Sequence, residues 1–147
     1  MRVICGIYKQ KENNLFNYKQ IDKVLQDEVK KKSVYETDYK SGEEVDGYYF
    51  LTHSRNIPYK DNDIFISSNY IIIINGYLTN KETLVRKYCY RSDITDLELI
   101  ALLYKSMGIK KIVNVIKGNF VLCVFDRKNK RVNAIKSPMS SYSLCYS

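Results

Sequence analysis

A run of five apolar residues at positions 70–74 limits the possible folds more than any other feature of the chain. Such a run has no polar alternation, which is expected of a strand that is covered on both faces. Asn69 and Asn75 flank it, and its five residues are far fewer than the roughly 20 that span a bilayer. The chain is therefore predicted to contain a buried central strand and no membrane segment.

The first half of the chain contains short strand patterns and one helical pattern. Apolar residues recur at helical spacing around Ile21, Val24 and Val29, among charged neighbours. Asn75 and Gly76, directly after the apolar run, favour a sharp turn. The predicted elements are a strand at 3–8, a helix over 21–29, a mostly looped stretch at 30–46, and strands at 47–52, 64–67 and 70–74.

The second half contains clearer helix signals. Thr95 and Glu98 form a capping-box pattern ahead of an apolar segment, and Gly108 is suited to end that helix. Helices placed between strands and hairpins indicate a mixed α+β layered fold, formed by one domain over residues 1–147. The other predicted elements are a helix over 109–116, hairpin strands at 120–125 and 131–135 around a turn at 126–130, and a last strand at 142–146.

The cysteines and the N-terminal residues bear on compartment and metal binding. Cys5, Cys89, Cys123 and Cys145 are scattered without a Cys-x-x-Cys pair, and His53 is the only histidine. Neither a structural metal nor a cofactor is therefore expected. The N-terminal segment lacks the long apolar stretch of a secretory signal, so we expect a cytoplasmic protein with reduced thiols.

A net charge of +8 raises the possibility of a nucleic-acid partner. The basic residues gather in two local runs, at 30–32 and 127–131, and a charge run is more often a solvated face. The 14 tyrosines could stack on bases, but many lie in strand-like segments, where they suit a half-buried sheet. A small basic nucleic-acid-binding domain therefore remains the alternative from an unrelated class.

A series of short motifs resembles class II glutamine amidotransferase domains, the N-terminal-nucleophile glutaminases that head asparagine synthetases. The resemblance spans the whole chain and is dense from Tyr70 onward. It implies a four-layer αββα sandwich of the Ntn-hydrolase type with a glutamine pocket between the ends of its two sheets. The motifs are Cys5-Gly6-Ile7, His53-Ser54-Arg55, Ile74-Asn75-Gly76, Asp96-Leu97-Glu98, Lys117-Gly118-Asn119-Phe120 and Phe125-Asp126.

The resemblance implies a role for each of five residues. Cys5 matches the nucleophile that attacks the glutamine side-chain amide, with its own α-amine as the base, since such an amine titrates near roughly 7.7 to 8. Asn75 and Gly76 match the pair that forms the oxyanion hole. Arg55 matches the arginine that binds the substrate carboxylate, and Asp96 the acid that holds the substrate amine.

Simpler interpretations apply to the same residues. Cys5 could equally be a small apolar residue that is buried in an edge strand. Asn75 and Gly76 are equally typical of a turn that ends a strand. Asp96, near the start of a helix, favours the helix dipole without any ligand.

Several departures from the family concern the chemistry itself. Four residues precede Cys5, so its nitrogen is a peptide amide without a basic lone pair unless they are removed. The family's Arg-Gly-Pro-Asp stretch has no counterpart in residues 30–46, and the acid that usually follows Asn-Gly is replaced by Tyr77. Lys136 and Ser137 replace an Arg-Asp pair near the end.

These departures predict a degraded, non-catalytic glutaminase-like domain, which acts as a structural partner of an ATP-dependent amide-forming synthetase. The alternative within the family is an active glutaminase that is matured by cleavage before Cys5 and binds glutamine. In the family a further strand follows the segment that matches 142–146, so the sandwich is expected to be truncated here. A synthetase domain or subunit, or a homodimer mate, would then fill the edge of this C-terminal strand.

Overall fold

The computed structural model describes residues 3–8, 23, 39–45, 48–54, 64–89 and 91–144. The chain divides into two compact units, residues 1–60 and 61–147, and each is described by itself. Of the helix predicted over 21–29, only Lys23 is described, and it is helical. The rest of that prediction lies outside the described residues.

The described part of the first unit is a three-stranded antiparallel sheet in the order β1-β3-β2. β1 (Val3–Tyr8) has the predicted bounds, and β3 (Tyr48–Ser54) begins and ends slightly later than predicted. β2 (Tyr39–Val45) lies where a loop was predicted, so that prediction is wrong for these seven residues. Pairing with β3 gives this polar segment its backbone hydrogen bonds, and strand formation depends on such context more than on composition.

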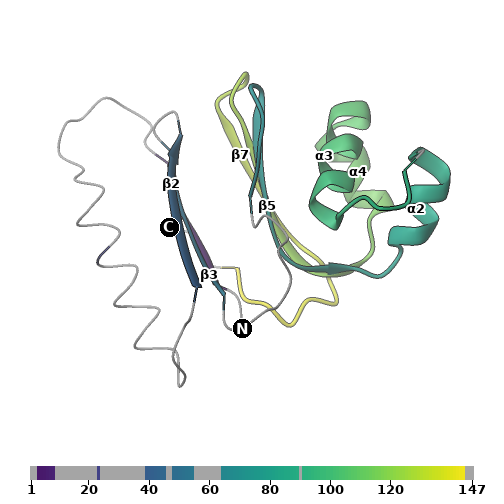
Figure 1. Ribbon diagram of the computed structural model, residues 1–147, viewed down its shortest axis with the longest axis horizontal. Helices are drawn as coiled ribbons and strands as arrows, with labels where there is room; N and C mark the ends of the chain where they lie inside the picture. Colours follow the sequence, from purple (N-terminus) through teal and green to yellow (C-terminus); the bar gives the residue numbers. More distant parts are fainter. Residues whose placement is uncertain are drawn as a thin grey trace. The chain divides into compact units, whose positions relative to one another are not determined.

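The second unit is a four-stranded antiparallel sheet in the order β4-β5-β6-β7. Helices cover one of its faces (Figure 1). The chain is thus a mixed α+β protein, as predicted. The strands are β4 (Ile64–Ile66), β5 (Tyr70–Leu78), β6 (Gly118–Asp126) and β7 (Arg131–Lys136), and the helices are α2 (Lys81–Tyr88), α3 (Asp96–Met107) and α4 (Ile109–Val115).

Both faces of the central strand β5 are buried. Ile72 and Ile74 belong to the core that the sheet forms with the helices, while Ile71 and Ile73 point to the opposite face and are at most 1% exposed. The prediction that the run at 70–74 is covered on both faces is confirmed for these four isoleucines. The helix-facing core also contains Leu78, Leu84, Leu97, Leu99, Ile100, Leu103, Ile112, Phe120, Leu122 and Val124.

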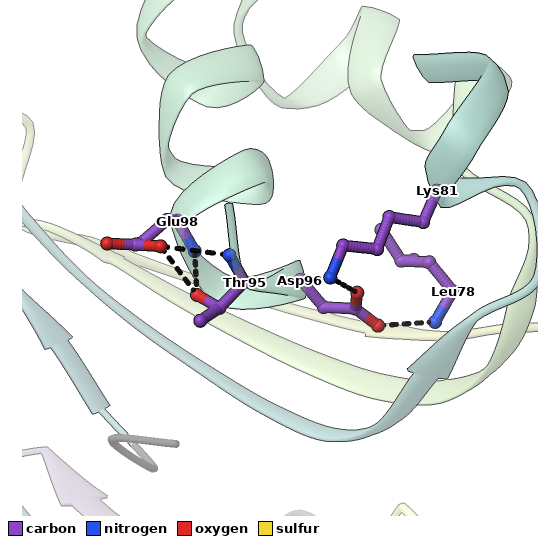
Figure 2. Close-up of polar contacts among 5 residues, drawn as sticks. All are labelled: Leu78, Lys81, Thr95, Asp96 and Glu98. Atoms are coloured by element: carbon purple, nitrogen blue, oxygen red, sulfur yellow. Dashed lines mark hydrogen bonds and ion pairs between the residues drawn. The ribbon is translucent and has the colours of Figure 1, made fainter. Parts of the chain in front are cut away.

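The boundaries of α3 are those that its end residues predict. The Thr95 hydroxyl oxygen accepts a hydrogen bond from the Glu98 backbone N–H at 3.1 Å, and the Glu98 carboxylate accepts one from the Thr95 N–H at 2.9 Å (Figure 2). These bonds from Thr95 lower the pKa of Glu98. Gly108 ends the helix with a φ of 73°. None of the helices in the described part of the chain is long and apolar enough to cross a membrane.

Two predicted features near the strands differ from the structure. The turn predicted at Asn75 and Gly76 is wrong, because β5 continues through both residues to Leu78. Residues 142–144 form no strand, and residues 145 and 146 of the predicted last strand lie outside the described part. The hairpin between β6 and β7, with its turn at 127–130, is confirmed.

Replacing Thr95 with alanine removes the oxygen that caps α3. We expect Thr95→Ala to lower the free energy of unfolding by about 1 kcal/mol, the usual cost of losing such a cap. Thr83→Ala is the matched control, because Thr83 is exposed within α2 and alanine favours a helix, so its effect should stay within about 0.5 kcal/mol. Urea unfolding measures both; equal effects would contradict the capping role.

Candidate functional site

The C-terminal end of β5 brings together three of the residues singled out by the motifs. Asn75 and Gly76 lie in β5, opposite Val121 and Phe120 of β6. Asp96 is the first residue of α3, and its carboxylate accepts a hydrogen bond from the Leu78 backbone N–H at 2.8 Å. This end of the strand is therefore the candidate site.

Two glycines allow β5 and β6 to approach closely at this end. Gly76 has a φ of 119°, and a Cβ atom there would collide with the Asn119 carbonyl oxygen and lie 2.8 Å from the Phe120 Cα. A Cβ on Gly118 would collide with the Tyr77 carbonyl oxygen. Larger residues at these two positions would push the strands apart. Because both residues lack a Cβ, β5 stays paired with β6 through Gly76 and does not turn there.

The side chains of Asn75 and Tyr77 alternate with the helix-facing residues of β5. Ile74 and Leu78 belong to the core under the helices, so Asn75 and Tyr77 project toward the opposite face. Asn75 is 8% exposed and Tyr77 is 54% exposed. A buried amide therefore lies two residues from an exposed phenol at the position where the resemblance implies an acid.

Asp96 joins three elements through one carboxylate. One oxygen, Oδ2, accepts the hydrogen bond from Leu78 at the end of β5, while Oδ1 lies 3.3 Å from the Lys81 Nζ at the start of α2 (Figure 2). The two charged side chains are 22% and 37% exposed, respectively, so the ion pair is partly shielded from solvent. Both oxygens of Asp96 thus contact groups of the chain itself.

Asn80 ties the connection after β5 to the connection before β6. Its Oδ1 accepts a hydrogen bond from the Lys117 N–H at 2.9 Å, and its Nδ2 donates to the Val115 carbonyl oxygen at 2.8 Å. The Thr79 N–H donates to the Lys117 carbonyl oxygen at 2.8 Å. These bonds hold the end of α4 against the start of α2.

The segment after β7 supports the Gly118-Asn119-Phe120 motif. Ser137 is buried; its hydroxyl donates to the Gly118 carbonyl oxygen, and its N–H donates to the Phe120 carbonyl oxygen at 3.0 Å. The Asn119 side chain exchanges two hydrogen bonds with Ser141, at 3.2 and 3.3 Å. Ser137, which departs from the family pattern, therefore stabilises the start of β6.

Asp126, the acid that ends β6, organises the following turn. Its carboxylate accepts hydrogen bonds from the Asn129 backbone N–H and side-chain amide at 2.9 and 2.7 Å, and from the Tyr104 hydroxyl at 3.1 Å. Burial acts to raise the pKa of Asp126, but the bonds from Asn129 and Tyr104 outweigh it and lower that pKa. Burial and the nearby Asp126 charge raise the pKa of Tyr104 to about 12.

Cys5 and Arg55 belong to the first unit. Cys5 lies in β1, opposite Leu51 of β3, and Arg55 directly follows β3 and is outside the described residues. The structure therefore places Asn75, Gly76 and Asp96 at one end of β5, and it does not place them relative to the other two. The catalytic and binding roles of all five residues stay predictions.

Metal-ligating and nucleophilic side chains are sparse in the described part of the chain. It contains no group of three or more His, Cys, Asp or Glu residues that could hold a metal ion. Cys89 and Cys123 are both free thiols. Burial raises the pKa of Cys123, which disfavours the reactive thiolate.

Lys81 and Asn80 are site residues that the motifs did not reveal. Both depend on α2, which was not predicted, although Leu84, Val85 and Tyr88 have the spacing of one apolar helix face. Asn80 immediately before such a face is also a common helix start. These two signals together could have located the helix and its first lysine.

Comparison with known families decides the identity of the second unit. The family described as a glutamine amidotransferase domain matches residues 57–147, more than half of the 147 residues. The chain belongs to the glutamine amidotransferase domain family. The match includes Asn75, Gly76 and Asp96 of this amidotransferase domain and begins after Cys5 and Arg55. A search of curated proteins found no match.

The close approach of β5 to β6 in the amidotransferase domain predicts unequal costs for two glycine substitutions. Gly108→Ala, where nothing lies within 4 Å of the added Cβ, should cost about 1–3 kcal/mol of unfolding free energy from backbone strain alone. Gly76→Ala adds a collision with the β6 backbone and should cost about 4 kcal/mol or more. Denaturant unfolding of both variants measures the difference, and a smaller effect at Gly76 would contradict the packing.

Proposed function

We propose that this chain is a class II glutaminase-like domain that does not hydrolyse glutamine. It serves as a structural partner of an ATP-dependent amide-forming enzyme of the asparagine synthetase type. Membership of the glutamine amidotransferase domain family supports the glutaminase origin. The main observation in favour of the proposed loss of activity is that both carboxylate oxygens of Asp96 contact other groups of the chain, namely the Leu78 N–H and the Lys81 Nζ.

Glutamine would compete with the chain itself for Asp96. If Asp96 held the substrate ammonium, as the resemblance implies, that ammonium would have to share Oδ1 with the like-charged Lys81 Nζ or displace it. Loss of the Oδ2 bond would also leave the Leu78 N–H unpaired, at a cost of about 1–3 kcal/mol if it stays buried. Tyr77 offers a phenol in place of the acid that could share the substrate's charge.

The proposed nucleophile has a separate defect. While residues 1–4 remain attached, the Cys5 nitrogen is an amide, and it cannot accept the thiol proton. The base and the substrate-ammonium contact are thus both impaired, which is why the proposal favours a binding role over catalysis. An active enzyme matured by cleavage before Cys5 is the competing hypothesis, and Asn75 and Gly76 are the residues that it would retain.

The burial pattern of the second sheet supports the finer fold that the resemblance implies. Helices cover one face, while Ile71, Ile73, Val121 and Phe125 on the other face are also buried. An inner sheet of an αββα sandwich requires two such apolar faces. The free thiols of Cys89 and Cys123 agree with the proposed cytoplasmic setting.

The whole chain is expected to release no ammonia from glutamine. Intact-mass spectrometry first establishes whether residues 1–4 are present, and a coupled ammonia assay then measures hydrolysis. A second form, with residues 1–4 removed by a specific protease, should be equally inactive because Asp96 remains occupied. Ammonia release by either form that disappears in Cys5→Ala would show an active glutaminase and overturn the proposal.

Removing the Lys81 ammonium should improve glutamine binding to the form that starts at Cys5. In Lys81→Met the stem is kept and Asp96 Oδ1 is freed, so we expect an affinity gain of about tenfold, as for a charge-assisted contact. Calorimetry measures it, with Lys87→Met, at an exposed position of α2, as the matched control. Tight glutamine binding by the unsubstituted form, or an equal gain in Lys87→Met, would refute the role of Lys81.

A further inference from the structure

The outer edge of β7 carries open backbone groups and unpaired cations. We propose that it binds an acidic, extended segment of a protein partner, which adds to the second sheet as a fifth strand. This inference depends on the edge and its charges, and it holds whether or not the chain hydrolyses glutamine.

β7 is one of the two edge strands of its sheet in the described part of the chain. It is the last strand in the order β4-β5-β6-β7, and no described strand pairs with its outer side. Four of its six side chains are exposed, namely those of Arg131, Val132, Ala134 and Lys136. An edge strand of this length offers a template for strand addition.

The direction of the β7 backbone groups follows from one hydrogen bond beyond the strand. The Ser137 N–H donates to the Phe120 carbonyl oxygen, so Ser137 faces β6. Backbone groups alternate along an antiparallel strand, and the N–H groups of Val132, Ala134 and Lys136 therefore point away from β6. These three donors, with their carbonyl oxygens, form the row that a partner strand would need.

Cations lie at both ends of this row. Four of the five residues from 127 to 131 are basic, and Lys136 ends the strand. The side chains of Lys128, Lys130, Arg131 and Lys136 are exposed, and none forms an ion pair with a described residue. They are therefore available to carboxylates of a partner.

The turn that presents the first cations is held in place. The Arg127 N–H donates to the Asn69 carbonyl oxygen at 2.9 Å, and its guanidinium donates to the Ser67 carbonyl oxygen at 2.5 Å. Asp126, the nearest acid in the sequence, already accepts hydrogen bonds from Asn129 and Tyr104. A fixed turn lowers the entropy cost of binding.

The charges select the kind of partner. A pair of two β7 strands would bring together two copies of residues 127–136, each with five basic residues and no acid, and such a juxtaposition of like charges is unfavourable. A nucleic acid would use the cations but not the row of N–H groups, and residues 127–136 contain no aromatic side chain on which a base could stack. An acidic polypeptide strand uses both features.

A labelled peptide of sequence Glu-Val-Thr-Thr-Val-Glu-Glu-Asp tests the proposal with the whole chain. In antiparallel register its first Glu lies opposite Lys136, its second Glu opposite Arg131, and its acidic end reaches the turn. Fluorescence anisotropy should show saturable binding. Binding should weaken about tenfold in Ala134→Pro, which removes one outward N–H and spares the β6 ladder. A second peptide carries N-methyl groups on its first Thr and its second Val, which lie opposite Ala134 and Val132. It keeps every charge but loses these two backbone donors, and it should also bind about tenfold more weakly.

The N-methylated peptide leaves the protein unchanged, so it decides the matter even if Ala134→Pro unfolds. Equal binding of the normal and N-methylated peptides would overturn strand addition in favour of simple charge attraction. No binding of either peptide would also refute the proposal, and it would mean that the cations only prevent other strands from pairing with this edge. Tighter binding of an oligothymidylate, lost in Lys128→Glu/Lys130→Glu and unaffected by Ala134→Pro, would assign the surface to nucleic acid and refute the proposal.

Discussion

The second unit depends on the nine-residue pairing between β5 and β6. Side chains from these two strands form the apolar surface against which α2, α3 and α4 pack. The pairing continues to the ends of both strands because Gly76 and Gly118 lack a Cβ. A wider separation at this end would move Leu78 and Phe120 away from the helix-facing core. The two glycines thus set the distance between β5 and β6, and that distance keeps Leu78 and Phe120 in the helix-facing core.

The polar groups around this strand end are used by the chain itself. Asp96 contacts Leu78 and Lys81, while Asn80 contacts both ends of the α4–β6 connection. A site that is to bind a polar ligand leaves some charged groups for it, whereas a structural joint satisfies them internally. The contacts of Asp96 and Asn80 in this glutamine amidotransferase domain are therefore in keeping with the proposed structural role.

Local signals predicted the elements that depend on local contacts. The capping box of α3, its end at Gly108 and the β6–β7 hairpin all follow from residues a few positions apart. The passage of β5 through Asn75 and Gly76 did not follow, because a neighbouring strand decides it: the Asn119 carbonyl oxygen occupies the space above Gly76. β2 and α2 were also missed, since pairing and packing outweigh their polar composition.

The same distinction applies to the candidate site. The motifs identified Asn75, Gly76 and Asp96, and these lie at one end of β5. They could not reveal that Lys81 would reach Asp96, since that contact joins two helices through a connection that only the folded structure defines. Family resemblance indicates which residues a site of this kind uses, whereas the contacts of the folded chain show which of them also bond to other groups of the chain.

Amide hydrogen exchange at Leu78 tests most directly the claim that Asp96 is a structural link and not a substrate ligand. NMR can compare this amide with that of Thr79, which is bonded to Lys117 and serves as an internal reference. The account predicts slow exchange at Leu78 that is unchanged by excess glutamine and accelerated in Asp96→Ala. A glutamine-dependent change confined to Leu78 would mean that Asp96 leaves the strand to bind substrate, and it would contradict the account.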